Sequence, residues 1–85
     1  MTLNTQLKTI LVAALNIQNV MPDQIDDDEP LFGGRLELDS IDALEMVYQV
    51  EKHFGIAIRD KNEARAALQT INTLSDYITR SKGLY

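Results

Sequence analysis

The chain has 85 residues, no cysteine and a formal net charge of −5 at pH 7, which excludes disulfide or thiolate chemistry and predicts one domain, 1–85. Ten acidic residues but only one basic residue, Arg35, lie between positions 23 and 51, which argues against nucleic acid and favours protein partners with basic patches. No apolar run approaches the roughly 20 residues that cross a bilayer, and no signal peptide is visible, so we expect a cytoplasmic monomer that does not contact membranes.

The first predicted element is an amphipathic helix over residues 3–16. Its apolar residues recur at the spacing of one helical face: Leu3, Leu7, Ile10, Leu11, Ala14 and Leu15. Thr2 is the predicted N-cap, and Asn16 or Asn19 is expected to close the helix. This element therefore buries one side against the rest of the chain.

A long connection is predicted over residues 17–38. Pro22, Pro30 and the pair Gly33-Gly34 oppose a continuous helix there. Loops of this length are uncommon in compact domains and are often functional. The apolar residues expected to hold this loop against the core are Ile25, Leu31, Phe32, Leu36 and Leu38.

The second predicted helix spans residues 40–54 and has a wide apolar face. That face consists of Ile41, Leu44, Met46, Val47, Tyr48, Val50 and Phe54. Gly55 is a good residue to end this helix because glycine accepts a positive φ without steric cost. The short apolar segment 56–58 that follows is interpreted as a buried connector.

Two further helices are predicted in the last third of the chain. Asp60 and Glu63 have the spacing of a capping box at the start of a short helix that runs to about Leu68. The segment 73–76 is typical of another helix start, and that helix is expected to end before Gly83. The predicted fold is all-α: a small four-helix bundle of three main helices and one short helix.

Ser40 is the candidate functional residue, and it falls at or beside the N-cap of the second helix. Serine and aspartate are ordinary capping residues, so the simplest interpretation is capping alone. The alternative is that Ser40 receives a phosphodiester, which the helix N-terminus would stabilise. Asp39 and Asp42 would partly oppose that charge, so we expect these acids to serve a basic partner surface instead.

The residues around Ser40 also carry a resemblance. They read Leu38-Asp39-Ser40-Ile41-Asp42-Ala43-Leu44-Glu45-Met46-Val47 and then Val50-Glu51-Lys52-His53-Phe54-Gly55-Ile56. This stretch resembles the acyl carrier proteins, whose hallmark is Asp-Ser-Leu followed by an acidic amphipathic helix. The resemblance is strongest in the middle of the chain and extends more loosely over nearly all of it.

The resemblance implies a non-catalytic carrier with a covalent 4′-phosphopantetheine arm. A phosphopantetheinyl transferase would move the arm from coenzyme A to Ser40, beside Asp39, and the arm's thiol would hold acyl groups for fatty-acid or polyketide-type synthesis. Ketosynthases, acyltransferases and reductases with basic docking patches would bind the second helix. The implied partner contacts are Asp39, Ile41, Asp42, Leu44, Glu45, Tyr48 and Glu51, with no catalytic or metal-ligating residue. An acyl chain could enter, by modest separation of the helices, a pocket lined by Leu7, Leu11, Met46, Val47, Val50, Ile58, Leu68 and Ile78.

Two departures from the family pattern indicate a specialised carrier rather than a housekeeping one. Arg35 places a positive charge near the attachment serine, in a longer approach than usual. The stretch 59–69 is longer and less acidic than in ordinary fatty-acid carriers. Its basic residues include Lys61 and Arg65, which join Lys52 and His53 late in the second helix.

Four alternatives remain beside the acyl carrier. A peptidyl or aminoacyl carrier uses the same arm, but its serine usually follows glycine and histidine rather than Leu38-Asp39. A calcium loop starting at Asp26 would have Pro30 in place of its third ligand. A hydrolase is opposed by the distance to His53, thirteen residues or roughly 20 Å along the helix, and by the absence of a Gly-x-Ser-x-Gly motif. A plain helical interaction domain would carry no modification.

Overall fold

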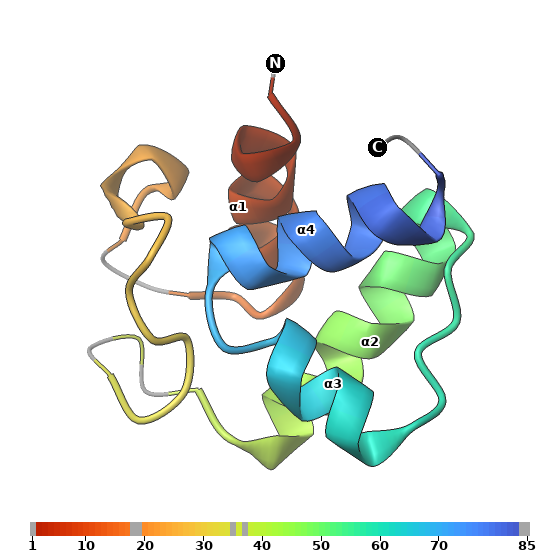
Figure 1. Cartoon of the computed structure of the whole chain (residues 1–85). Coiled ribbons are helices and arrows are strands. Elements are labelled where there is room, and N and C mark those ends of the chain that lie inside the picture. The colour runs from red at the N-terminus through yellow and green to blue at the C-terminus, as the bar shows by residue number, and fades with distance from the viewer. Residues whose placement is uncertain (1, 18–19, 35, 37, 84–85) are drawn as a thin grey trace.

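The computed structural model describes residues 2–17, 20–34, 36 and 38–83. The helices of the described residues, shown in Figure 1, are α1 (Leu3–Ala14), the 3-10 turn η1 (Pro22–Gln24), α2 (Ser40–Phe54), α3 (Lys61–Ala67) and α4 (Ile71–Ser81). These ranges contain one isolated β-bridge, between Phe32 and Leu38, and no strand. The predicted all-α bundle of three main helices and one short helix is therefore confirmed. None of the described helices has the length and apolar character needed to span a bilayer.

The core lies where α1 packs against α2 and α4, and α3 packs against α4 (Figure 1). Its buried residues are Leu7, Leu11, Ile25, Leu31, Leu36, Met46, Val50, Ile58, Ala67, Leu68, Ile71, Leu74 and Ile78. All of them are apolar, and the buried set of the described residues contains no charged or polar side chain. Burial of apolar surface is therefore the main term that holds the helices together.

Most predicted helix ends are found in the structure. Thr2 caps α1, because its Oγ1 accepts a hydrogen bond from the Thr5 N–H at 3.2 Å. Asn16 follows that helix with a φ of 52°, the left-handed conformation that ends helices and that asparagine tolerates better than most residues. Gly55 ends α2 with a φ of 70°, as predicted. Asn19, the other candidate for closing α1, lies outside the described residues.

The predicted start of the last helix at 73–76 is wrong, because α4 begins at Ile71 with Thr70 as its N-cap. Thr70 Oγ1 accepts a hydrogen bond from the Thr73 N–H at 3.1 Å, and Thr73 Oγ1 accepts one from the Thr70 N–H at 2.9 Å. Thr73 is thus the third residue of the helix and completes a reciprocal cap. Ile71 and Leu74 are fully buried, so the first turn faces the core.

The cap of α3 is only half of the box that the spacing predicts. Asp60 Oδ1 accepts hydrogen bonds from the N–H groups of Asn62 and Glu63, at 2.7 and 3.1 Å. The Glu63 carboxylate accepts a hydrogen bond from the Tyr77 hydroxyl at 3.3 Å, which joins α3 to α4. That acceptor and burial together raise the pKa of Tyr77 above its ordinary value, with burial the larger cause.

The loop that leads to α2 is fixed to the junction between α3 and α4. The Leu31 N–H donates to the Gln69 carbonyl oxygen and the Asn72 N–H donates to the Asp27 carbonyl oxygen, both at 2.9 Å. The Asn72 side chain also donates to Asp28 Oδ1 at 2.7 Å. Leu31 is completely buried, as the sequence predicts for a residue that holds this loop in place. The loop that leads to Ser40 is therefore held in place by residues at the start of α4, far away in the sequence.

An ion pair joins α1 to the same loop and makes the stability depend on pH. Lys8 Nζ lies 2.7 Å from Asp27 Oδ1, and the Lys8 side chain is largely buried. The hydrogen bond from Lys8 holds the pKa of Asp27 below its ordinary value of 3.8, although burial partly opposes this. A carboxylate with a lowered folded-state pKa stabilises the fold above its unfolded pKa, and this contribution is lost as pH falls through the folded value.

We expect Asp27→Asn to lower the free energy of unfolding by less than about 1 kcal/mol near neutral pH, because Asp27 is partly exposed. The difference from the wild type should disappear at an acid pH below the lowered folded-state pKa of Asp27, where the carboxylate is protonated in both states. The urea midpoints of the variant and the wild type, measured at neutral and at acid pH, give this difference in stability. Lys8→Met should show the same pH dependence, and an equal loss at both pH values would contradict the ion pair as the cause.

Candidate functional site

Ser40 is the first residue of α2, and Asp39 is the residue that caps the helix. Asp39 Oδ1 accepts hydrogen bonds from the N–H groups of Ile41 and Asp42, at 3.0 and 3.1 Å. Asp42 Oδ2 accepts one in return from the Asp39 N–H at 2.9 Å. This reciprocal cap shows that Ser40 stands beside the N-cap and is not needed for capping, and attachment at Ser40 stays a prediction.

The Ser40 side chain is free for chemistry. It is exposed, and its hydroxyl forms no hydrogen bond with the residues that the structure describes. A phosphodiester on Ser40 would meet the positive end of the α2 dipole. The N–H groups of Ile41 and Asp42 already donate to Asp39, so the stabilisation would be electrostatic rather than a set of hydrogen bonds. The site thus fits a covalently attached phosphate group. Asp39 is committed to the cap, and its predicted cofactor-binding role stays a prediction.

One face of α2 presents large apolar side chains to solvent. Ile41 is 74% exposed, Leu44 is 72% exposed and Tyr48 is 55% exposed, whereas Met46 and Val50 on the other face are buried. The four predicted acids of this surface are Asp39, Asp42, Glu45 and Glu51. The exposure of the three apolar residues agrees with the prediction that they lie outside the core, and their role as partner contacts stays a prediction.

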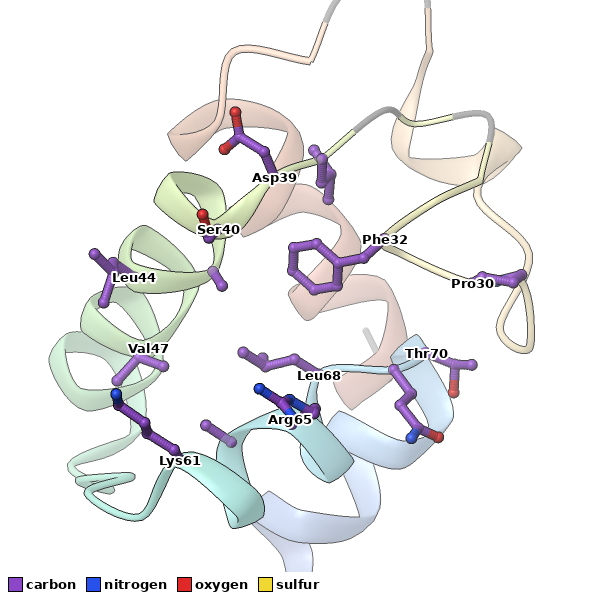
Figure 2. A pocket seen from close by; sticks show the side chains of 14 residues that line it. Pro30, Phe32, Asp39, Ser40, Leu44, Val47, Lys61, Arg65, Leu68 and Thr70 are labelled. Carbon is purple, nitrogen blue, oxygen red and sulfur yellow. The ribbon is translucent and has the colours of Figure 1, made fainter.

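A groove of about 740 Å³ opens beside Ser40, between α2, α3 and the loop that contains Pro30 and Phe32 (Figure 2). Its apolar wall includes Phe32, Leu38, Ala43, Leu44, Val47, Ala64 and Leu68. The bridge between Phe32 and Leu38 folds the loop back on itself, so both residues reach the groove. Ser40 therefore borders both solvent and an apolar cavity.

This groove differs from the acyl pocket that the resemblance implied. Val47 and Leu68 line it, but the other six predicted residues do not. Those six are buried in the closed core: Leu7, Leu11, Met46, Val50, Ile58 and Ile78. The groove lies at the edge of the bundle, where α3 stands off from α2, and the predicted core pocket, which requires the helices to separate, stays a prediction.

The cations that line the groove are Lys61 and Arg65 on α3, which were predicted only as part of a less acidic stretch. Their spacing of four residues puts them on one face of the helix and could have revealed them. Arg35, the cation predicted near the attachment site, lies outside the described residues.

The geometry gives Ser40 no catalytic partner. His53 is near the far end of α2, about 20 Å along the helix from Ser40, so it cannot act as a base for that hydroxyl. The carboxylates of the proposed calcium loop bind their own backbone: Asp26 Oδ1 accepts from the Asp28 N–H at 2.8 Å, and Glu29 Oε2 accepts from the Asp26 N–H at 2.7 Å. No cluster suited to a metal ion occurs among the described residues.

Comparison with known protein families agrees with this geometry. The family model described as "Phosphopantetheine attachment site" matches residues 5–78. The matched segment contains Ser40, its cap and the whole of the groove described above.

Proposed function

The chain belongs to the phosphopantetheine-attachment family, and we propose that it is an acyl carrier protein that holds acyl groups as thioesters on an arm esterified to Ser40. Members of this family are non-catalytic carriers with a covalent 4′-phosphopantetheine group, and they interact with a phosphopantetheinyl transferase and with synthase enzymes. The observation that carries the assignment to Ser40 is its exposed hydroxyl without a hydrogen-bond partner among the described residues.

In the attachment step, Ser40 Oγ forms a bond to the phosphorus that bears the pantetheine of coenzyme A. The bond from that phosphorus to the oxygen that bridges the two phosphates breaks, and 3′,5′-adenosine bisphosphate leaves. The hydroxyl proton passes to a base of the transferase. The attached arm supplies the thiol that a chain without cysteine lacks. The α2 N-terminus stabilises the new negative charge through its dipole.

The surface of α2 supplies a docking face for the partner enzymes. Its exposed apolar residues are Ile41, Leu44 and Tyr48, and its acids are Asp39, Asp42, Glu45 and Glu51. Such a face fits ketosynthases, acyltransferases and reductases whose own docking surfaces are basic around an apolar centre, because charge complementarity steers the encounter and fixes the orientation. Ser40 lies at one end of this face, so a docked partner would find the arm beside it.

The groove favours acyl over aminoacyl cargo. Its lining is mostly apolar, and it begins at Ser40, so it can cover a hydrocarbon chain when the long, flexible arm folds back along it. A charged α-ammonium group would lose hydration there, next to Lys61 and Arg65, without a described carboxylate in the groove other than the capping residue Asp39. We therefore rank an acyl carrier above a peptidyl or aminoacyl carrier.

Loading of the purified chain tests this function. Incubation with a promiscuous phosphopantetheinyl transferase and coenzyme A should add one arm, measured by intact mass. In a separate reaction, octanoyl-coenzyme A and the same transferase should add one octanoyl-bearing arm to the unmodified protein. The loaded octanoyl carrier should be a substrate for a ketosynthase, and an amino acid should not be transferred to the arm by an adenylation enzyme. No mass gain with several transferases would contradict the carrier, and efficient aminoacylation would favour the peptidyl alternative.

A further inference from the structure

Charge is distributed unevenly along the groove beside Ser40, and the carrier function alone does not require this. Figure 2 shows Asp39 and Ser40 at one end and Lys61 and Arg65 at the other, with Val47 and Leu68 near the cations. Val47 is seven residues after Ser40, which corresponds to about 10 Å along α2. An apolar wall therefore leads from the attachment serine to a pair of positive charges.

The two cations have no carboxylate to pair with in the described part of the chain. The ion pairs found there join Lys8 to Asp27 and Arg80 to Asp76. Lys61 and Arg65 lie four residues apart on one face of α3, where like charges repel each other. The acid on the same helix, Glu63, accepts a hydrogen bond from Tyr77 on the side of α4. The groove thus holds positive charge that α3 does not neutralise on that face.

The phosphopantetheine arm itself has no negative charge that can pair with Lys61 and Arg65. Its charged group is the phosphodiester, which is bonded to Ser40 and stays at the opposite end of the groove. Beyond the phosphate, the pantetheine consists of hydroxyl, amide and methylene groups, which are neutral. An anion can reach Lys61 and Arg65 on the arm only if the cargo carries it, and the apolar wall before them calls for a hydrocarbon segment first.

We propose that the preferred cargo is an acyl chain that ends in a free carboxylate, with its methylene segment against Val47 and Leu68 and its carboxylate between Lys61 and Arg65. This inference rests on the proposed attachment of the arm to Ser40. It deepens the acyl carrier function by naming the class of acyl group. The carboxylate would form charge-assisted hydrogen bonds with both side chains, of which the planar Arg65 guanidinium suits a bidentate contact.

The test compares the octanedioyl chain with and without the two cations. A transferase loads the apo-protein from a coenzyme A analogue that carries an octanedioyl group through a stable amide in place of the thioester, labelled with carbon-13 at the free carboxyl, and the carboxyl signal is titrated by NMR. At low ionic strength the carboxyl pKa should lie about 0.5 below that of the same chain on coenzyme A, because two nearby cations favour the ionised form.

The matched variants separate local contact from net charge. Lys61→Gln with Arg65→Gln should restore the pKa seen on coenzyme A. Lys52→Gln with Arg59→Gln removes the same charge from exposed residues that do not line the groove, and it should leave most of the lowering in place. Equal effects of the two double variants, or no lowering in the wild type, would overturn the proposal.

A measurement of intact mass distinguishes failure of the cargo assignment from failure of the proposed carrier function. If the arm does not attach to Ser40, the carrier function and the cargo assignment fall together. If the arm and chain are attached but the carboxyl pKa equals that on coenzyme A, the cargo assignment alone is wrong.

Discussion

We expect the Ser40→Ala variant to gain no mass on incubation with coenzyme A and a phosphopantetheinyl transferase, while the wild type gains one arm. The reason is that the chain then lacks the only oxygen proposed to form the phosphodiester. The fold should be unaffected, because Asp39 and not Ser40 caps α2, and alanine is the best helix former at an exposed helical position. Intact mass and far-ultraviolet circular dichroism measure the two expectations.

A second serine provides the control for this experiment. Ser81, the last residue of α4, is also exposed, and Ser81→Ala should be loaded as fully as the wild type. The same mass gain in Ser40→Ala and in the wild type would show that another hydroxyl receives the arm. Loss of loading in both variants would show that the effect does not belong to Ser40.

The Leu74→Ala variant should show the largest loss of stability. Leu74 is completely buried in the first turn of α4, where that helix packs on α1 and α3. Truncation of a buried leucine removes its transfer free energy and leaves a cavity, at a cost of about 2–5 kcal/mol. A whole domain has only about 5–15 kcal/mol of stability. The urea concentration at the midpoint of unfolding should therefore fall strongly. A variant that is already unfolded in water would also support the prediction.

Leu44→Ala is the matched control, because the same side chain is removed where it is 72% exposed. It should change the free energy of unfolding by less than about 0.5 kcal/mol. Similar urea midpoints for the two variants would mean that α4 does not contribute to the core in the way the structure shows. A large loss in Leu44→Ala alone would mean that the α2 face is covered in solution.

The elements of this fold could be predicted because each is encoded by a short stretch of the chain. The apolar spacing from Leu3 to Leu15 reports one helix, and Thr2 and Gly55 mark ends by their own conformational preferences. The start of α4 could not be placed in this way. Two threonines three residues apart are equally good caps, and the choice of Thr70 depends on the burial of Ile71 against distant parts of the core.

The site was predictable in chemistry but not in shape. Ser40 and its acidic neighbours stand in one continuous motif, so the resemblance of that motif to a known family pointed to attachment where the residue types alone indicated capping. The groove depends on how far α3 stands from α2, which is set by the connection through 55–60 and by the loop that contains Phe32. No local pattern records that separation, so the sequence did not predict the groove, and a pocket opened in the core around Met46 and Val50 stays a prediction.

The contacts of Asn72 have a consequence for the order of events during synthesis. Its side chain donates to Asp28 across 44 positions of the chain and accepts from Asn4 across 68. Closure of such long segments is slow compared with helix formation. A nascent chain that still lacks its last helix cannot complete either contact. The segment in front of Ser40 reaches its final place only after translation has passed Asn72, and a transferase that reads the finished surface would act after that point.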